Sequence, residues 1–257
     1  MFSRRRKDGN EIMYLEAPYF GDVELCPKTL DYLQEKGYQK IVLFASIQFV
    51  NNLEKIEKQL KELGIVIIST KPARAHIPRQ LLGCDNSHGS LNLEGKEFDA
   101  FLYIGDGRFH PLALVYAQKD LDEMKEIVCN DPISKGMSLL EINEVRDLLK
   151  KYRGSLMKFF TKKNVGILIT IKPGQEQYLP ALALEKKFPD KKFYFFVDNN
   201  ISFDQLENFN FIDVWINTAC PRIGLDDQEK FSSGVVNLSD ALQAEKILCA
   251  ESVFNGL

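Results

Sequence analysis

Short apolar runs alternate with amphipathic stretches along most of this chain. Runs of β-branched and aromatic residues predict buried strands, and apolar residues three or four positions apart predict helices. The predicted strands cover residues 40–46, 65–70, 98–104, 126–130, 165–170, 192–197 and 213–219. The predicted helices cover residues 51–63, 110–118, 138–160, 175–187, 203–209 and 239–250. Strands that alternate with helices in this way predict parallel sheets joined by right-handed crossovers.

The alternation restarts after the long predicted helix, which indicates two modules. We therefore predict an α/β fold with two related modules, each a mostly parallel sheet flanked by helices. The first module covers residues 30–137, a connecting helix covers 138–161, and the second module covers 162–257. Residues 1–29 precede them as an N-terminal tail and linker.

Composition and charge then narrow the functional classes. The 257 residues are 45% hydrophobic with a net charge of −3, so a disordered chain is not expected. Because 33 basic residues stand against 36 acidic ones, direct nucleic-acid binding is not expected either. The basic cluster at residues 4–7 is interpreted as a solvated tail. There is no apolar run of about 18 residues and no signal-peptide pattern, so we expect a cytoplasmic protein without membrane contact.

The five cysteines are Cys26, Cys84, Cys129, Cys220 and Cys249. None belongs to a CxxC pair, so a local zinc or ferredoxin-type motif is absent. Cys84 and Cys220 stand in loops, one in each module, and Cys220 follows a predicted strand at the end where parallel sheets bind ligands. A small buried cysteine at a strand end is the competing interpretation. We interpret Cys129 and Cys249 as core residues, and we leave Cys26, just before a predicted helix, open.

Three polar turns either bind a ligand or merely connect elements. The turn that begins at Gly105 ends a strand and opens a helix near His110, so its backbone N–H groups could hold an anion. Gln175 follows the corresponding turn of the second module and offers both an amide donor and an acceptor. Arg222 could stabilise a thiolate or a carboxylate, and Asp226 could hold a ribose or an amine. Each feature is equally open to a structural reading as a turn or a helix cap.

Taken in order, these segments closely resemble the archaeal diphthamide synthases, the 2-(3-amino-3-carboxypropyl)histidine synthase family. The matching segments are Leu82-Gly83-Cys84, residues 104–112, residues 171–175, Ala219-Cys220-Pro221-Arg222 and Leu225-Asp226-Asp227. Each motif is weak alone, whereas the ordered set is specific. The resemblance covers nearly the whole chain from about Tyr14 onward.

The resemblance implies a transferase of diphthamide biosynthesis that acts on translation elongation factor 2. The family uses S-adenosylmethionine and a [4Fe-4S] cluster. The reduced cluster cleaves the bond from sulfur to the methionine γ-carbon, and the resulting 3-amino-3-carboxypropyl radical adds to a histidine ring. By the same resemblance, Cys84 and Cys220 are cluster ligands. Gly105, His110, Gln175, Arg222 and Asp226 are expected to bind the S-adenosylmethionine.

The chain departs from the family pattern in one respect. Family members have three modules that each donate one cysteine, and this sequence shows no counterpart of the first module. Two thiolates hold a [4Fe-4S] cluster poorly. Three alternatives follow: the first module is a separate subunit; Cys26 or a cysteine of a second copy, as in a dimer, supplies the third ligand; or the chain is a non-catalytic accessory subunit. We favour the split or oligomeric enzyme. A nucleotide binder without iron is disfavoured, because His110 stands where a GxGxxG loop needs glycine.

Overall fold

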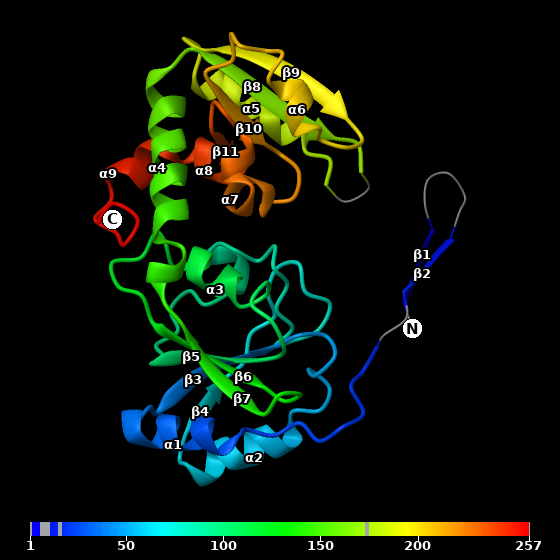
Figure 1. The fold of residues 1–257 in the computed structure, drawn as a ribbon, viewed down its shortest axis with the longest axis vertical. Helices are drawn as coiled ribbons and strands as arrows, with labels where there is room; N and C mark the ends of the chain where they lie inside the picture. The colour runs from blue at the N-terminus through cyan, green and yellow to red at the C-terminus, as the bar shows by residue number, and fades with distance from the viewer. Residues whose placement is uncertain (1, 6–10, 15–16, 173–174, 257) are drawn as a thin grey trace. The chain divides into compact units, whose positions relative to one another are not determined.

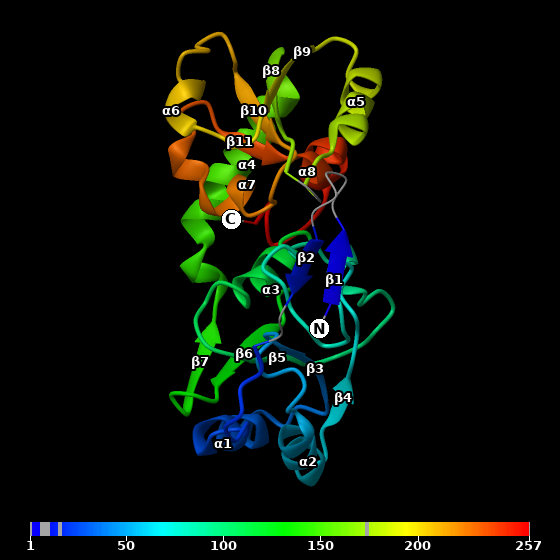
Figure 2. The same ribbon diagram turned by 90° about the vertical axis from the view of Figure 1, so that its right-hand side faces the viewer.

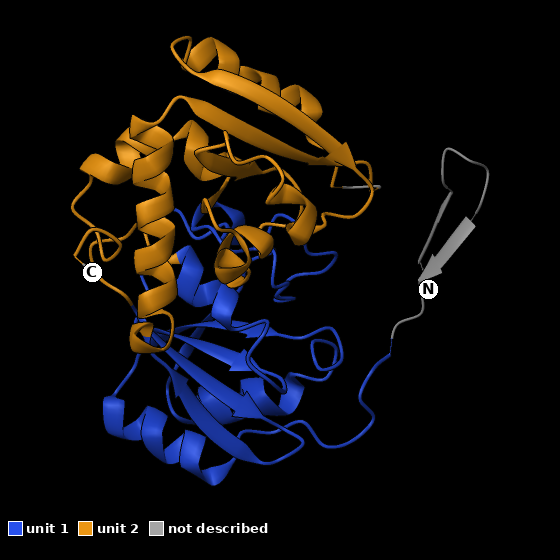
Figure 3. Ribbon diagram, turned by 45° about the horizontal axis from the view of Figure 1, so that its top comes forward, with its two compact units in different colours: residues 1–117, 125–141 blue, residues 118–124, 142–257 orange. Residues whose placement is uncertain are grey.

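The computed structural model describes residues 2–5, 11–14, 17–172 and 175–256. The chain divides into two compact units (Figure 3). Unit 1 comprises residues 1–117 and 125–141, and unit 2 comprises residues 118–124 and 142–257. Each unit contains a mostly parallel sheet flanked by helices, so the predicted fold class is confirmed.

Unit 1 is built on a five-stranded sheet in the order β4-β3-β5-β6-β7, in which β7 alone is antiparallel to its neighbour. Its strands are β3 (Lys40–Ala45), β4 (Val66–Ile68), β5 (Ala100–Ile104), β6 (Glu126–Asp131) and β7 (Gly136–Leu140). Its helices are α1 (Pro27–Lys36), α2 (Glu54–Glu62), α3 (Leu112–Ala117) and the 3₁₀ turn η1 (Gly89–Leu91). Helices α1 and α2 lie on one side of the sheet and α3 on the other (Figures 1 and 2).

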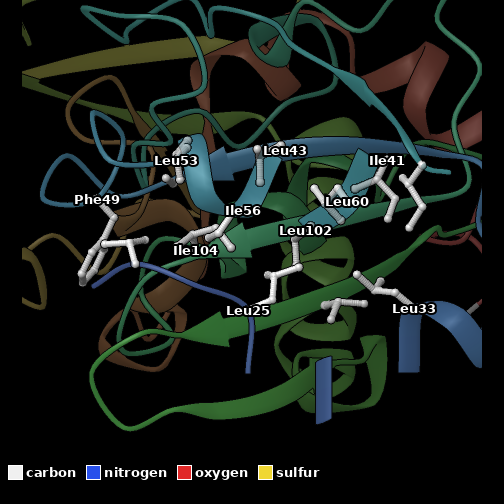
Figure 4. Packing of buried hydrophobic residues seen from close by; sticks show 14 of the residues in the cluster. Leu25, Leu33, Ile41, Leu43, Phe49, Leu53, Ile56, Leu60, Leu102 and Ile104 are labelled. Atoms are coloured by element: carbon white, nitrogen blue, oxygen red, sulfur yellow. The ribbon is translucent and has the colours of Figure 1, made fainter. Parts of the chain in front are cut away.

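The core of unit 1 follows from the pattern that predicted it. Ile56 and Leu60 of α2 are fully buried and pack with Ile41 and Leu43 of β3 (Figure 4). Gly64 follows α2 with φ of +77°, a left-handed conformation that glycine adopts without a steric cost. Every residue of β5 is buried, as expected for a central parallel strand covered on both faces.

Unit 2 is built on a four-stranded, fully parallel sheet in the order β11-β10-β8-β9. Its strands are β8 (Asn164–Thr170), β9 (Lys192–Asp198), β10 (Val214–Asn217) and β11 (Val235–Asn237). Its helices are α4 (Arg146–Thr161), α5 (Tyr178–Lys187), α6 (Phe203–Leu206), α7 (Ile223–Asp226), α8 (Leu238–Leu242) and α9 (Ala244–Cys249), with the 3₁₀ turns η2 (Ile142–Glu144) and η3 (Gln228–Lys230). Helix α4 packs along β10 and β11.

The long predicted helix over residues 138–160 is wrong in its first third. Residues 136–140 form β7, which pairs with β6 and places buried Leu140 opposite Ile127, and the helix starts at Arg146. The predicted helix over 239–250 is broken at Gln243 into α8 and α9. Strand β11 and helix α7 are not predicted by the sequence, and neither is the N-terminal hairpin of β1 (Phe2–Arg5) and β2 (Glu11–Tyr14).

The cysteine expectations are divided. Cys129 is buried in β6, as predicted, and Cys26 immediately precedes α1. The core prediction for Cys249 is wrong, because this residue is exposed. Helix α9 turns Ala244 and Ile247 inward, and a residue two positions beyond Ile247 lies on the opposite side of a helix.

Some predicted features fall where nothing can be described. Arg6 and Lys7 of the basic cluster, and Pro173 and Gly174 of the turn before Gln175, lie outside the described residues. In the part of the chain that is described, no helix has both the length and the apolar character that a membrane crossing requires.

Candidate functional site

The Cys84 loop, residues 79–88, is fastened to the carboxyl end of β3 through its main chain. The N–H of Ala45 donates to the carbonyl of Arg79 at 2.8 Å, and the N–H of Leu81 donates to the carbonyl of Ala45 at 2.9 Å. Gln80 thereby forms a parallel bridge with Ala45. The half-buried Cys84 follows three residues after Leu81. The loop therefore lies at the sheet edge where parallel folds bind ligands.

The structure brings the Cys84 loop against the turn that begins at Gly105. A Cβ at Gly83 would stand 2.5 Å from Cε1 of Phe109, so the absence of a side chain at Gly83 lets this ring pack directly against the loop. The ring of His110, half-buried, lies edge-on to Phe109 with the centroids 5.3 Å apart. The N–H of Gly105 donates to the carbonyl of Asn130 at 3.1 Å, so this donor is used within the sheet. Two of the motifs singled out by the sequence are thus neighbours in unit 1.

Two buried polar atoms directly after Cys84 have no hydrogen-bond partner among the described residues. They are Oδ2 of Asp85 and Nδ2 of Asn86. Asp85 is completely buried, and its Oδ1 accepts the N–H of Arg74 at 3.2 Å. Burial raises the pKa of the Asp85 carboxyl, although the hydrogen bond and the charge of Arg74 oppose it. Unsatisfied buried atoms are costly and are expected where a loop is completed by a bound group or water.

Cys26 has a different environment, with its contacts inside unit 1. Its N–H donates to Oδ1 of Asn130 at 2.9 Å, and its Sγ lies 3.2 Å from the hydroxyl of Thr29. The Thr29 hydroxyl donates to the same Asn130 oxygen at 2.8 Å. Cys26 is 4% exposed, so it is a buried part of the connection between α1 and β6.

In unit 2, the Cys220 loop, residues 218–222, connects β10 to α7 (Figure 1). The hydroxyl of Thr218 donates to the carbonyl of Leu168 at 2.7 Å, which ties the start of the loop to β8. The N–H of Ile223 donates to the carbonyl of Cys220 at 3.0 Å, so α7 begins directly after the half-buried cysteine. Cys220 therefore lies just beyond the carboxyl end of a parallel strand, which is where ligand-binding residues of parallel α/β folds are found.

Two of the predicted ligand-binding residues contact each other. Nε and Nη2 of Arg222 both lie 2.6 Å from Oδ2 of Asp226. The side chain of Arg222 is 6% exposed and that of Asp226 is 31% exposed. The cation beside Cys220 is therefore partly neutralised by its own helix, and an incoming carboxylate would have to share it with Asp226.

A pocket of about 210 Å³ lies at the carboxyl ends of β8, β9 and β10 in unit 2. Its described lining includes Gln175 and Ala219, the residue before Cys220, but neither Arg222 nor Asp226. Its polar lining residues are Thr170, Lys172, Gln175, Asn199, Asn200 and Asp227, and its apolar ones include Ile201, Phe203 and Ile223. A larger pocket in unit 1 lies at the amino ends of β3 and β4, the edge opposite to the Cys84 loop.

The predicted residues therefore fall into two groups. Cys84, Gly105 and His110 belong to unit 1, whereas Gln175, Cys220, Arg222 and Asp226 belong to unit 2. Among the described residues, no group of three or more His, Cys, Asp or Glu side chains is placed to hold a metal ion. Thiolate sulfur is the usual donor to iron–sulfur clusters, so the two loop cysteines fit such a group in kind, whereas the described part of the chain holds no complete ligand set.

Sequence reasoning missed the residues that support the Cys220 loop, above all Asn217 and Asn237. Each ends a short apolar strand, Val214-Trp215-Ile216 in one case and Val235-Val236 in the other. Asn217 could have been found from the sequence, because it is an amide at the carboxyl end of a predicted buried strand. Asn237 could not have been found in this way, because β11 itself was not predicted.

Comparison with known proteins gives consistent matches. A family model described as "Putative diphthamide synthesis protein" matches residues 3–248. The 2-(3-amino-3-carboxypropyl)histidine synthase of Pyrococcus horikoshii is 28% identical over 84% of this chain. The protein of that name from Methanocaldococcus jannaschii is 32% identical over 75% of this chain.

The fold is also found among solved structures. A crystal structure of Dph2 from Pyrococcus horikoshii with a 4Fe-4S cluster superposes with a TM-score of 0.67 at 24% identity, over 88% of this chain. The match covers 64% of that chain, and the two curated relatives are covered over 61% and 48% of their lengths. This chain therefore spans about half to two thirds of the proteins that it resembles.

Proposed function

The chain belongs to the diphthamide synthesis protein family, and on this basis we propose that it takes part in making 2-(3-amino-3-carboxypropyl)histidine on translation elongation factor 2. The proposed reaction transfers the 3-amino-3-carboxypropyl group from S-adenosylmethionine to a histidine ring. The family match and the two loop cysteines at the carboxyl edges of their sheets support it.

Cys84 and Cys220 are the proposed ligands of a [4Fe-4S] cluster. Both are half-buried, and both follow main-chain or side-chain contacts that fix a loop beside a parallel sheet. The unpaired buried atoms of Asp85 and Asn86 add to the case for a bound group beside Cys84. When bound, such a cluster supplies the electron that breaks the bond from sulfur to carbon.

The chain's own residues would bind and orient the S-adenosylmethionine. Gln175 offers a donor and an acceptor inside the 210 Å³ pocket of unit 2. Arg222 would bind the methionine carboxylate by a charge-assisted hydrogen bond. Asp226, which forms an ion pair with Arg222 in the structure, would then bind the amino group or the ribose instead. Gly105 and His110 of unit 1 are the other residues that we propose to bind S-adenosylmethionine.

The third cluster ligand would come from outside this chain. Cys26 is buried and its N–H and Sγ contact Asn130 and Thr29, which favours a structural role for it. A cysteine from a separate first-module subunit or from a second copy of the chain would complete the set. We also propose that this enzyme acts in the cytoplasm.

The test is an anaerobic assay with reconstituted chain, dithionite, S-adenosylmethionine and elongation factor 2, with and without a first-module partner. We expect methylthioadenosine and a modified histidine peptide, both abolished by Cys220→Ser and retained by Cys249→Ser, whose cysteine is exposed. A stable complex with elongation factor 2 but no product in any combination would instead establish an accessory subunit.

A further inference from the structure

A pair of buried asparagines lies beneath the Cys220 loop. Asn217 ends β10 and Asn237 ends β11, and the two residues are register partners in these adjacent parallel strands. Asn217 is 2% exposed and Asn237 is 6% exposed. Because a buried amide is costly unless it is hydrogen-bonded, the contacts of these two side chains indicate why amides are placed here.

Those contacts converge on the main chain around the thiol. Nδ2 of Asn217 donates to the carbonyl of Cys220 at 2.9 Å and to Oδ1 of Asn237 at 2.8 Å. Oδ1 of Asn217 accepts the N–H of Ala219 at 3.0 Å, and Nδ2 of Asn237 donates to the carbonyl of Pro221 at 2.9 Å. The two amides together hold three consecutive residues of the loop.

We propose that Asn217 and Asn237 are positioning residues for Cys220, whose carboxamides fix the main chain on both sides of the thiol. The inference rests on the proposed function only for the use to which that thiol is put. An apolar pair at the same positions would fill the space but leave the carbonyls of Cys220 and Pro221 without these donors.

The asparagine pair is itself anchored in the core of unit 2. The N–H of Asn237 donates to the hydroxyl of Tyr152 at 3.0 Å, and that hydroxyl donates to Oδ2 of Asp240 at 2.6 Å. Nζ of the buried Lys119 lies 3.5 Å from the same carboxylate oxygen. The hydroxyl of Tyr152 in α4 therefore fixes the main chain of Asn237. The position of the Cys220 loop is set by these buried contacts and not by solvent-exposed ones.

The carboxamide of Asn237 is also closely packed against Gly224 of α7. A Cβ at Gly224 would overlap the carboxamide of Asn237, so the first turn of α7 rests directly on that amide. The glycine at 224 and the asparagine at 237 therefore fit each other, and together they define where α7 begins relative to Cys220.

The test measures alkylation of Cys220 by iodoacetamide in the full, cluster-free chain. The rate is followed by peptide mass spectrometry against Cys84 in the same molecule, and the limiting rate at high pH separates loop position from the thiol pKa. Asn217→Asp and Asn237→Asp keep the side-chain shape but turn acceptors toward the carbonyls. We expect the Cys220-to-Cys84 ratio to rise at least about threefold in each, since a lost hydrogen bond of ordinary strength frees the loop by that factor.

Asn255→Asp is the matched control. Nδ2 of Asn255 also donates to two carbonyls of unit 2, those of Ile247 and Ala250, both at 2.7 Å. This variant should leave the ratio unchanged. A loss of general stability would raise the rate in all three variants alike, whereas loss of positioning raises it only in the first two.

A second measurement needs no variant. In the wild-type chain, NMR should show the carboxamide protons of Asn217 and Asn237 exchanging with water far more slowly than those of exposed Asn51. Equal exchange, or an unchanged ratio in variants that remain folded, overturns the proposal. A chain that binds no cluster would leave both results untouched, so failure of the proposed function is distinguishable from failure of this inference.

Discussion

The Cys84 and Cys220 loops are held beside similar sheets by different parts of the chain. In unit 1, main-chain hydrogen bonds between Ala45 and the segment Arg79 to Leu81 fasten the loop to β3. In unit 2, the carboxamides of Asn217 and Asn237 perform the same task from inside the core. The first support uses atoms that every residue has, whereas the second depends on the identity of two side chains.

This difference indicates where each loop is vulnerable. Most substitutions leave main-chain bonds in place, so the Cys84 loop should tolerate changes to its neighbours as long as the backbone conformation is kept. A buried amide network tolerates little, because any change leaves a partner unsatisfied. Substitutions of the same kind in the two loops should therefore have unequal effects.

The largest difference is expected for one glycine in each loop region. Gly224→Ala would push into the buried carboxamide of Asn237 and should destabilise unit 2 by about 2–3 kcal/mol. Gly83→Ala meets the ring of Phe109, which is 53% exposed and can swing away. It should cost unit 1 less than about 1 kcal/mol.

Urea unfolding with one probe in each unit measures this difference. Trp215, the sole tryptophan of the sequence, is buried in β10 and reports on unit 2. Pulsed alkylation of buried Cys129 in β6 reports on unit 1. The unit 2 midpoint in Gly224→Ala is compared with the unit 1 midpoint in Gly83→Ala. Equal shifts from the wild-type midpoints would contradict the expected difference between the two loop regions.

A smaller effect should follow from the backbone of Arg79. This residue has φ of +66°, a conformation that non-glycine residues adopt at a cost. Its side chain offsets that cost through an ion pair with Glu57 and a 2.6 Å hydrogen bond to Ser69. Arg79→Ala should destabilise unit 1, and Arg79→Gly should be about 1 kcal/mol more stable than the alanine variant. Cys129 alkylation in urea measures the stability of unit 1 in both variants. If Arg79→Gly is no more stable than Arg79→Ala, the backbone of Arg79 is not strained.

The smallest effect concerns the pH dependence of unit 1, away from the cysteines. Burial alone would raise the pKa of Glu126, but hydrogen bonds from Tyr38, Lys36 and Tyr32 lower it below its ordinary value of about 4.5. A carboxyl with a lowered pKa stabilises the fold above that ordinary value, and the stabilisation is lost as pH falls through the lower one.

The contribution of Glu126 should be under about 1 kcal/mol, because its side chain is 40% exposed. In Glu126→Gln, the unit 1 midpoint should be lower at neutral pH and should fall less between pH 5 and 3 than in the wild type. If the unit 1 midpoint of Glu126→Gln falls between pH 5 and 3 as much as that of the wild type, other carboxyls cause the acid sensitivity. Unit 2, followed through Trp215, serves as the control and should be unaffected by the substitution.

The sequence predicted the fold class and most strands, because runs such as Lys40–Ala45 and Asn164–Thr170 are apolar and sharply bounded. It failed where local pattern and tertiary pairing disagree. Residues 138–140 continue the spacing of the helix that follows them, yet pairing with β6 makes them a strand. The three-residue β11 is too short for any periodicity to show.

The sequence singled out candidate ligands but not the residues that support them. Cys84, Cys220 and Gln175 were singled out because loop thiols and an amide after a turn can bind ligands, and their roles stay predictions. The pairing of Arg222 with Asp226 follows from a separation of four residues on a helix, but the burial of Arg222 does not. Asn237 contacts the Cys220 loop, and Tyr152 contacts Asn237, through tertiary packing alone, which no local pattern records.

The most direct test of the account is the iron and sulfide bound after anaerobic reconstitution, measured in the wild type and in single cysteine variants with the partner that completes the set. We predict a full cluster in the wild type, Cys249→Ser and Cys26→Ser, and its loss in both Cys84→Ser and Cys220→Ser. A full cluster retained in either of the last two variants would contradict the proposal that both cysteines are cluster ligands.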